Sequence, residues 1–356
     1  MEQPEIPKAR RCSGVPAVAG GTAPAERGSG IECLRILAMF MVLVLHADFA
    51  ALGIPSASDF GAGAWGVSLR CLLEQLALPA VNCFVLVSGW FSIRTSPRGV
   101  GSLLFQVLYC SLVALAVAAC LPGGHIDWKT AGLSFVPGYY HWFIRSYLGL
   151  MILAPVLNAW LRQATVRQMA VVTAAFYLFQ TVYGWVMGAD GFNGGYSLLS
   201  FVGLYLLGAV ARRLEWQRRG WRMWLMAYLL CTVAATVWQV LSLRQGMKIP
   251  AMTLAYDSPL TVTSALSLTM LFASLHFRNL AVNLAAASAL AVYLLHFSPF
   301  LFQRYLHVCR HIYKVYSGPM AVLMTALFLL AVFGVSILLD QPRRLLWNSL
   351  RRRKRN

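Results

Sequence analysis

The sequence predicts an all-α membrane protein with about ten transmembrane helices in a single domain. The chain has 356 residues, of which 59% are hydrophobic and 12% charged, whereas an ordinary soluble domain carries about 25% charged residues. Its mean hydropathy is +0.64. The apolar residues form runs close to the roughly 20 residues that a helix needs to cross a bilayer, so we expect the chain to cross the membrane repeatedly.

Ten apolar segments are expected to span the membrane, because charged, proline-containing or glycine-containing stretches separate them. They are residues 31–52, 76–94, 100–121, 140–161, 168–188, 196–213, 221–243, 257–277, 284–305 and 319–340. Together they form one predicted domain, residues 31–340. Residues 1–30 are rich in Pro, Gly and Ala and contain no apolar run of the signal-peptide kind, which predicts a disordered cytoplasmic tail. Residues 341–356 are expected to form a basic cytoplasmic tail.

The net charge of +18 is interpreted as a signal of membrane topology. If both termini lie inside, the inside segments hold 22 of the 30 Lys and Arg residues and the outside segments hold 8. Positive residues gather in cytoplasmic loops, so both termini are expected in the cytoplasm. Nucleic-acid binding is not expected, because the aromatic residues do not interleave with the basic clusters. The eight cysteines form no CxxC or CxxH pair, so no metal site is expected.

The first span, "IECLRILAMFMVLVLHADFA", carries an arginine near its start and a histidine near its end. Arg35 and His46 are eleven residues apart, or about 20° past three helical turns, so they share one face about 16 Å apart along the axis. Glu32 lies one turn before Arg35, a spacing that permits an ion pair. Asp48 lies about 200° from His46 and does not share its face.

Two interpretations of this face remain open from the residues alone. In the first, Arg35 snorkels to the headgroups and His46 joins two helices. In the second, both line a polar cavity, as ionisable groups inside membranes usually do. In the second case a neutral imidazole takes a proton from a hydroxyl, which is general-base chemistry. A cation at the cytoplasmic end of the same face holds a phosphate.

Further polar groups lie in the second span and just after it. In "LPAVNCFVLVSGWFSIR", Asn82 and Ser88 serve either to join helices or to line a cavity. Arg94 and Arg98 follow at the cytoplasmic end, where the alternative to a site is the positive-inside topology.

The fourth and ninth spans supply the remaining candidates. In "YYHWFIRSYLGLMILAPVLN", Trp142 and Tyr147 suit either interfacial anchors or a site, and Arg145 opposes the charge rule at the outer end. In "ASALAVYLLHFSPF", His296 lies in mid-span with Tyr293 one turn before it. A second deep histidine favours a polar cavity shared with His46.

The pattern "ECLRILAMFMVLVLH" resembles the first span of the membrane acyltransferase-3 family, which are bacterial integral-membrane O-acyltransferases. "VNCFVLVSGWF", "YYHWFIRSYLGLMILAPVLN", "GYSLLSFVGLYLLGAVAR" and "ASALAVYLLHF" resemble later segments of that family, in the same order. The resemblance runs from about residue 31 to 340. The family's Arg-x-x-Arg motif is replaced here by "IRTSPR", in which Arg94 and Arg98 stand one residue further apart.

This resemblance implies a ten-helix protein of the bacterial inner membrane. It would transfer an acyl group, usually acetyl, from cytoplasmic acyl-CoA to a hydroxyl of a cell-surface glycan or lipid-linked sugar, with no bound cofactor. Arg35 and His46 fall on the family's first-span arginine and histidine. The donor phosphates would meet Arg35, Arg94 or Arg98, and His46, with His296 as the next candidate, would act as base or carry the acyl group. The candidates for polarising the thioester or lining the cavity are Asn82, Ser88, Trp142, Arg145, Tyr147 and Tyr293.

A transporter or glycan-export factor without acyl transfer is the alternative, since intramembrane His, Arg and Asn also suit a substrate pathway. Against it, the sequence has no internal repeat and no matched pair of helices broken by Gly or Pro in two halves. The identity of the acceptor, the length of the acyl group and the oligomeric state are not determined by the sequence.

Overall fold

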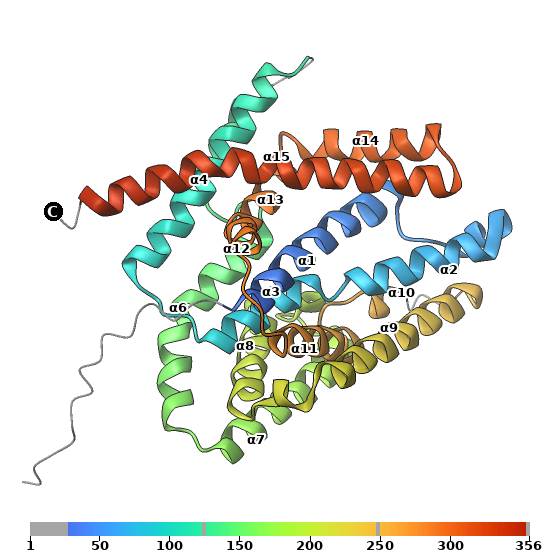
Figure 1. Cartoon of the computed structure of the whole chain (residues 1–356). Helices are drawn as coiled ribbons and strands as arrows, with labels where there is room; N and C mark the ends of the chain where they lie inside the picture. The colour runs from blue at the N-terminus through green and yellow to red at the C-terminus, as the bar shows by residue number, and fades with distance from the viewer. Residues whose placement is uncertain (1–27, 123–125, 247–249, 354–356) are drawn as a thin grey trace, which may run out of the picture.

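The computed structural model describes residues 28–122, 126–246 and 250–353, and these residues form helices and no strand (Figure 1). Nearly all of the predicted N-terminal tail, residues 1–27, lies outside the described residues, as do residues 354–356 of the C-terminal tail. The last helix runs on to Arg353. The last predicted span and the first part of the predicted tail therefore form one continuous helix.

Seven helices are long and apolar enough to cross a membrane, and each overlaps a predicted span. They are Ser29–Ala50, Gly63–Phe91, Pro97–Cys120, Trp142–Gln163, Val166–Val186, Trp221–Arg244 and Gly318–Leu350. The predicted all-α, multi-pass membrane fold is therefore confirmed. The other three predicted spans correspond to shorter helices, so the number of ten spans stays a prediction.

The helices alternate with the charged, proline-containing or glycine-containing stretches that separate the apolar runs of the sequence. The first half contains α1 (Ser29–Leu45), a π-helical turn (His46–Ala50, called the π turn below), a 3-10 turn (Ala57–Asp59), α2 (Phe60–Ala77), α3 (Ala80–Phe91), α4 (Pro97–Cys120), α5 (Trp128–Ser134), α6 (Trp142–Gln163), α7 (Val166–Phe179) and a second π-helical segment (Gln180–Val186). Ser96 and Thr165 cap α4 and α7 by accepting a bond from a backbone amide three residues on. Such caps fix where each helix begins.

The second half is built in the same way. It contains short 3-10 turns at Asn193–Gly195 and Trp216–Arg219 together with α8 (Leu198–Arg213), α9 (Trp221–Arg244), α10 (Pro250–Thr253), α11 (Pro259–Ala273), α12 (Leu280–Ala286), α13 (Ala289–His296), α14 (Phe302–Val315) and α15 (Gly318–Arg353). Pro259 occupies the first turn of α11, where its missing N–H leaves no hydrogen bond unmade.

Helix α1 lies at the centre of the bundle. It packs against α2, α3, α11, α12 and α13, with the α14–α15 pair on one side and the α9–α11 pair on the other (Figure 1). Helices α3 and α8 cross so closely that a Cβ atom at Gly89 or Gly208 would overlap the opposite backbone. Small residues allow this kind of close approach in membranes, and the crossing fixes α3 beside α1.

The ninth predicted span, 284–305, differs from the structure. The helix ends at His296, a turn of residues 297–301 follows, and α14 starts at Phe302. Pro299 provides the reason, because it cannot donate the backbone bond that a continuing helix needs. His307 and His311 lie on α14, beyond this turn.

Candidate active site

A cavity of about 750 Å³ runs along one face of α1. Arg35, Met39, Val42 and His46 line it from that helix, and their spacing of four, three and four residues is that of a single helical face. Arg35 and His46 thus share a face, as their spacing predicts. The other walls come from α3, α6, the α12–α13 segment and the loops before α8 and α11, and include Phe84, Ser88, Trp142, Phe143, Tyr147, Tyr196, Leu254, Tyr256, Leu290 and Tyr293.

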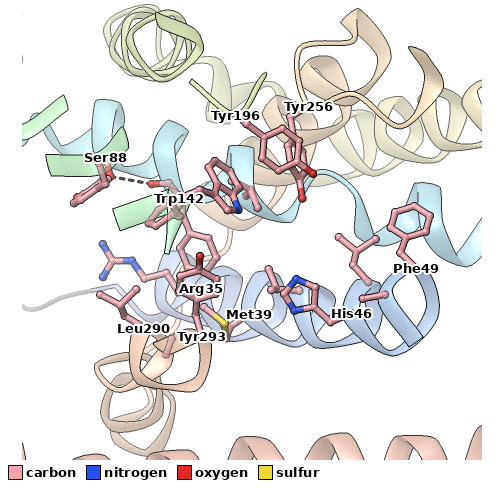
Figure 2. A pocket seen from close by; sticks show the side chains of 18 of the residues that line it. Arg35, Met39, His46, Phe49, Ser88, Trp142, Tyr196, Tyr256, Leu290 and Tyr293 are labelled. Carbon is pink, nitrogen blue, oxygen red and sulfur yellow. Dashed lines mark hydrogen bonds between the residues drawn. The ribbon is translucent and has the colours of Figure 1, made fainter. Parts of the chain in front are cut away.

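Arg35 marks one end of the cavity (Figure 2). Its Nη1 atom lies 3.2 Å from each carboxylate oxygen of Glu32, so the ion pair that the sequence predicts is present. The Arg35 side chain is 33% exposed and the Glu32 side chain 7%. Of the described residues, Arg35 is the one charged side chain that lines the cavity.

His46 meets His296 across the helix interface. Nδ1 of His46 lies 2.8 Å from Nε2 of His296, and Nδ1 of His296 lies against the carbonyl oxygen of Val292. A carbonyl only accepts, so Nδ1 of His296 carries the proton and donates it. In a neutral His296, the form that apolar burial favours, Nε2 then accepts the hydrogen bond. His46 therefore donates from Nδ1, and its Nε2 holds the free lone pair.

Aromatic rings hold the His46 imidazole in place. Phe297 stacks on it with a centroid distance of 4.9 Å and an interplanar angle of 20°. Phe302 meets it edge-on at 5.3 Å. Both rings come from the segment that follows α13, so the break after His296 brings them to His46. The ring is fixed by packing on its faces and by a hydrogen bond at one nitrogen.

Four further predicted site residues line the cavity, namely Ser88, Trp142, Tyr147 and Tyr293. The Ser88 and Tyr147 hydroxyls are 3.2 Å apart, and Ser88 also donates to the carbonyl of Phe84, one turn back on α3. The Tyr293 ring stacks on Phe297, which places it in the same aromatic packing as His46.

His296 contacts His46 but does not line this cavity, so the expected sharing of one cavity by the two histidines is not found. Four further predicted site residues lie away from the cavity wall. Asn82 is buried and donates to the Tyr256 carbonyl at 2.7 Å, so it joins α3 to the loop before α11. Arg145 is exposed near Gly138. Arg94 and Arg98 are exposed in the α3–α4 connection and the first turn of α4. None of the four is part of the lining, and the donor-binding role of Arg94 and Arg98 stays a prediction.

An aromatic cluster lines the cavity opposite α1. Of its three residues, only Trp142 was predicted from the sequence. Trp142, Tyr196 and Tyr256 meet with centroid distances of 4.5 Å (Trp142–Tyr196), 4.8 Å (Tyr196–Tyr256) and 6.0 Å (Trp142–Tyr256). Figure 2 shows the hydroxyls of the two tyrosines side by side, on the edge of the rings that faces α1. Tyr196 and Tyr256 belong to loops, where no helical periodicity marks a shared face.

A third histidine near the site, His141, was not among the residues predicted from the sequence. It is 4% exposed, and its ring packs edge-on against Tyr293 at 5.4 Å and lies 6.3 Å from Phe297. It precedes α6 and does not line the cavity. His141 lies in the run "YYHWF". The sequence does not indicate whether a histidine among interfacial aromatic residues is buried or exposed.

The arrangement offers a basic nitrogen, a cation and several hydroxyls around one cavity, and comparison with known proteins is consistent with such chemistry. A family model described as an acyltransferase domain matches residues 29–340. No curated protein and no solved structure matches the chain at a significant level.

Proposed function

The chain belongs to the acyltransferase family whose domain model spans residues 29–340, and we propose that it transfers an acetyl or other acyl group from acyl-CoA to a hydroxyl of a glycan or lipid-linked sugar. One observation carries the proposal. His46, with a free Nε2 lone pair, lines the same cavity as Arg35, which is the one charged lining residue of the described chain.

The Arg35 end of the cavity receives the donor. The planar guanidinium suits a phosphate. Among the described residues its one hydrogen-bond partner is Glu32, which a phosphate can replace or join. By the helical rise, Arg35 and His46 lie about 16 Å apart along α1, a length of the order of the pantetheine arm of CoA. The phosphate and the thioester would then occupy two ends of one helix face.

His46 acts as the base. Its Nε2 removes the proton from the acceptor hydroxyl, and the oxygen attacks the thioester carbonyl carbon. When the carbon–sulfur bond breaks, the thiolate of CoA recovers the proton from His46. During the step, His296 accepts a hydrogen bond from Nδ1 of the imidazolium, which orients the ring and disperses its charge. Transfer through an acyl-histidine at the same nitrogen is the alternative route.

The negative charge that develops on the thioester oxygen needs hydrogen-bond donors. Tyr147 and Tyr293 supply hydroxyls in the cavity wall, whereas the single proton of Ser88 is donated to the Phe84 carbonyl. A mostly apolar wall strengthens such bonds, because little water competes with them. The two tyrosines replace Asn82 as the preferred candidates, since Asn82 does not line the cavity and its amide donates to the Tyr256 carbonyl.

The acceptor occupies the side of the cavity formed by Trp142, Tyr196 and Tyr256. Aromatic side chains with a polar tip present an apolar face together with a hydrogen-bonding edge, which matches a sugar ring and its hydroxyls. No acidic side chain of the described residues lines the cavity, so a cationic amine would find no counter-charge. These features support a neutral polyhydroxylated acceptor.

The distribution of positive charge supports the orientation in the membrane. The topology expected from the 22:8 division of Lys and Arg puts the Arg35 end at the cytoplasm. The loops that hold Tyr196 and Tyr256 would then face outward. Donor and acceptor would approach His46 from opposite sides of the bilayer.

Purified protein in nanodiscs, supplied with radiolabelled acetyl-CoA and membrane glycolipids, tests the proposal. Label should pass to the sugar fraction with the wild type and not with the His46→Asn variant. Sugar uptake into proteoliposomes without any transfer of label would favour a transporter and contradict the proposal.

A further inference from the structure

The helical segment that carries His46 is not an α-helix. Residues His46–Ala50 form the π turn, a wide turn of a kind that is rare and is frequently found at functional sites. Its sequence, "HADFA", contains neither proline nor glycine. Local sequence therefore does not impose the wide turn, and contacts from other helices must hold it.

The first of these contacts comes from α2. Asp48 lies inside the π turn and its side chain is 4% exposed. Arg70 donates from Nε to Oδ1 of Asp48 at 2.8 Å and from Nη2 to Oδ2 at 3.3 Å. The same Nη2 donates to the Gly53 carbonyl at 2.6 Å. One guanidinium thus ties a side chain within the π turn to the backbone just beyond it.

The second set of contacts comes from α14. Arg310 donates from Nε to the Ala51 carbonyl at 2.8 Å. Tyr305 donates to the Leu43 carbonyl at 2.6 Å, in the last turn of α1. These bonds satisfy backbone oxygens near the end of α1. The π turn is held by α2 on one side and by α14 on the other.

A series of buried hydrogen bonds holds α2, the helix that carries Arg70, against α9. Glu74, one turn after Arg70 on α2, is 1% exposed and accepts a bond from Nε2 of Gln239 on α9 at 2.7 Å. Oε1 of Gln239 accepts in turn from Nε2 of Gln75 at 2.8 Å. This series fixes α2 against α9, and so fixes the helix from which Arg70 reaches Asp48.

We propose that Arg70 is a positioning residue for acyl transfer, because it locks the π turn through Asp48 and Gly53 and so aims His46 at His296 and the cavity. This role rests on the proposed function of His46. Arg70 is not part of the cavity lining and acts through the helix. About 22 residues of chain separate Arg70 from Asp48, so the lock exists only in the folded bundle.

Arg70→Gln is the principal test, in the nanodisc assay with acetyl-CoA. It should lower kcat roughly 10- to 100-fold, the size of effect that a misplaced catalytic group produces, while the KM for acetyl-CoA stays unchanged. Arg70→Lys should recover part of the kcat, because the ammonium pairs with Asp48 but lacks the fork that also reaches Gly53. Arg304→Gln is the matched control, since Arg304 donates to the Pro122 carbonyl and not to α1.

Loss of the Asp48–Arg70 pair also affects folding, because the Asp48 carboxylate is buried, so a second variant separates the two effects. In Asp48→Leu/Arg70→Met, apolar side chains of similar size replace the pair, an exchange that often leaves stability unchanged. The double variant should accumulate and bind acetyl-CoA normally and still show the lowered kcat. The ¹⁵N resonances of His46, identified by their loss in His46→Asn, should also shift from those of an Nδ1-protonated ring.

Two results would overturn the positioning role. One is an Arg70→Gln kcat equal to that of Arg304→Gln, and the other is a folded double variant with wild-type kcat and an unshifted His46 spectrum. Failure of the proposed function itself looks different, because His46→Asn would then retain full transfer in the same assay. The two failures are therefore distinguishable.

Discussion

Both ends of α1 hold an arginine against a carboxylate, but the two pairs are built differently. Arg35 and Glu32 stand three residues apart on one helix, and the arginine side chain is 33% exposed. Asp48 and Arg70 join two helices, and their side chains are 4% and 29% exposed, close to the 7% of Glu32 and the 33% of Arg35. The local pair can open without moving a helix, so Arg35 is free to exchange Glu32 for a ligand. The long-range pair cannot open without releasing the π turn.

This difference assigns separate tasks to the two ends. The Arg35–Glu32 pair lies within one helix and holds no other segment in place, whereas Arg70 on α2 binds both Asp48 and the Gly53 carbonyl. The Arg35 end is therefore suited to binding and release, and the His46 end to fixed geometry. We expect changes at the Arg35 end to alter KM for the donor, and changes at the His46 end to alter kcat.

The largest effect is expected at His46 itself. His46→Ala and His46→Asn should each lower the transfer rate by roughly 10²–10⁴, the usual contribution of a general base, and leave acetyl-CoA binding largely intact. Turnover by purified protein and donor binding by calorimetry measure the two quantities. Near-normal turnover in both variants would remove His46 from the mechanism and leave His296 as the next candidate.

A smaller effect is expected at His296, because it acts through His46. His296→Leu removes the acceptor for Nδ1 of His46 and should lower kcat roughly 10- to 100-fold. His296→Gln should retain more activity, since its amide oxygen can accept the same bond. The ratio of the two rates is the measurement, and equal rates would mean that the hydrogen bond does not orient His46.

Arg35→Lys should raise the KM for acetyl-CoA about tenfold with little change in kcat. Lysine keeps the charge but loses the planar fork that holds a phosphate, and one charge-assisted hydrogen bond is worth about 1.5–3 kcal/mol. Arg98→Lys provides a matched comparison at an exposed arginine away from the cavity. If Arg98→Lys raises the KM as much as Arg35→Lys does, the donor phosphates reach beyond the cavity to α4.

The smallest effect is expected for Glu32→Gln. The change removes a partner that competes with the donor for Arg35, and the pair is worth about 1 kcal/mol or less. The KM for acetyl-CoA should therefore fall, by less than about fivefold, with kcat unchanged. A fall in kcat comparable to that of Arg70→Gln would contradict the comparison, because both pairs would then serve the geometry of His46.

Residue patterns within the first helix predicted how Arg35, His46 and Glu32 lie relative to one another. The shared face of Arg35 and His46 and the Arg35–Glu32 pair both follow from the helical repeat, which is local. Asn82, Arg145, Arg94 and Arg98 do not line the cavity, and the donor-binding role of Arg94 and Arg98 stays a prediction. Each stands on or beside a correctly placed helix, but the neighbouring helices direct Asn82 to a backbone carbonyl and leave the three arginines exposed.

Composition and hydropathy by themselves determined that this chain is a multi-pass helical membrane protein, because burial in a bilayer requires long apolar runs whatever the arrangement of the helices. The periodicity of the first span determined which of its residues face one way. Only the tertiary structure brought His46 to His296 and added Tyr196 and Tyr256 from two loops. It also holds a π turn that the sequence "HADFA" does not predict. A helix sets the direction of a side chain about its own axis, whereas the partner in that direction depends on how distant segments pack.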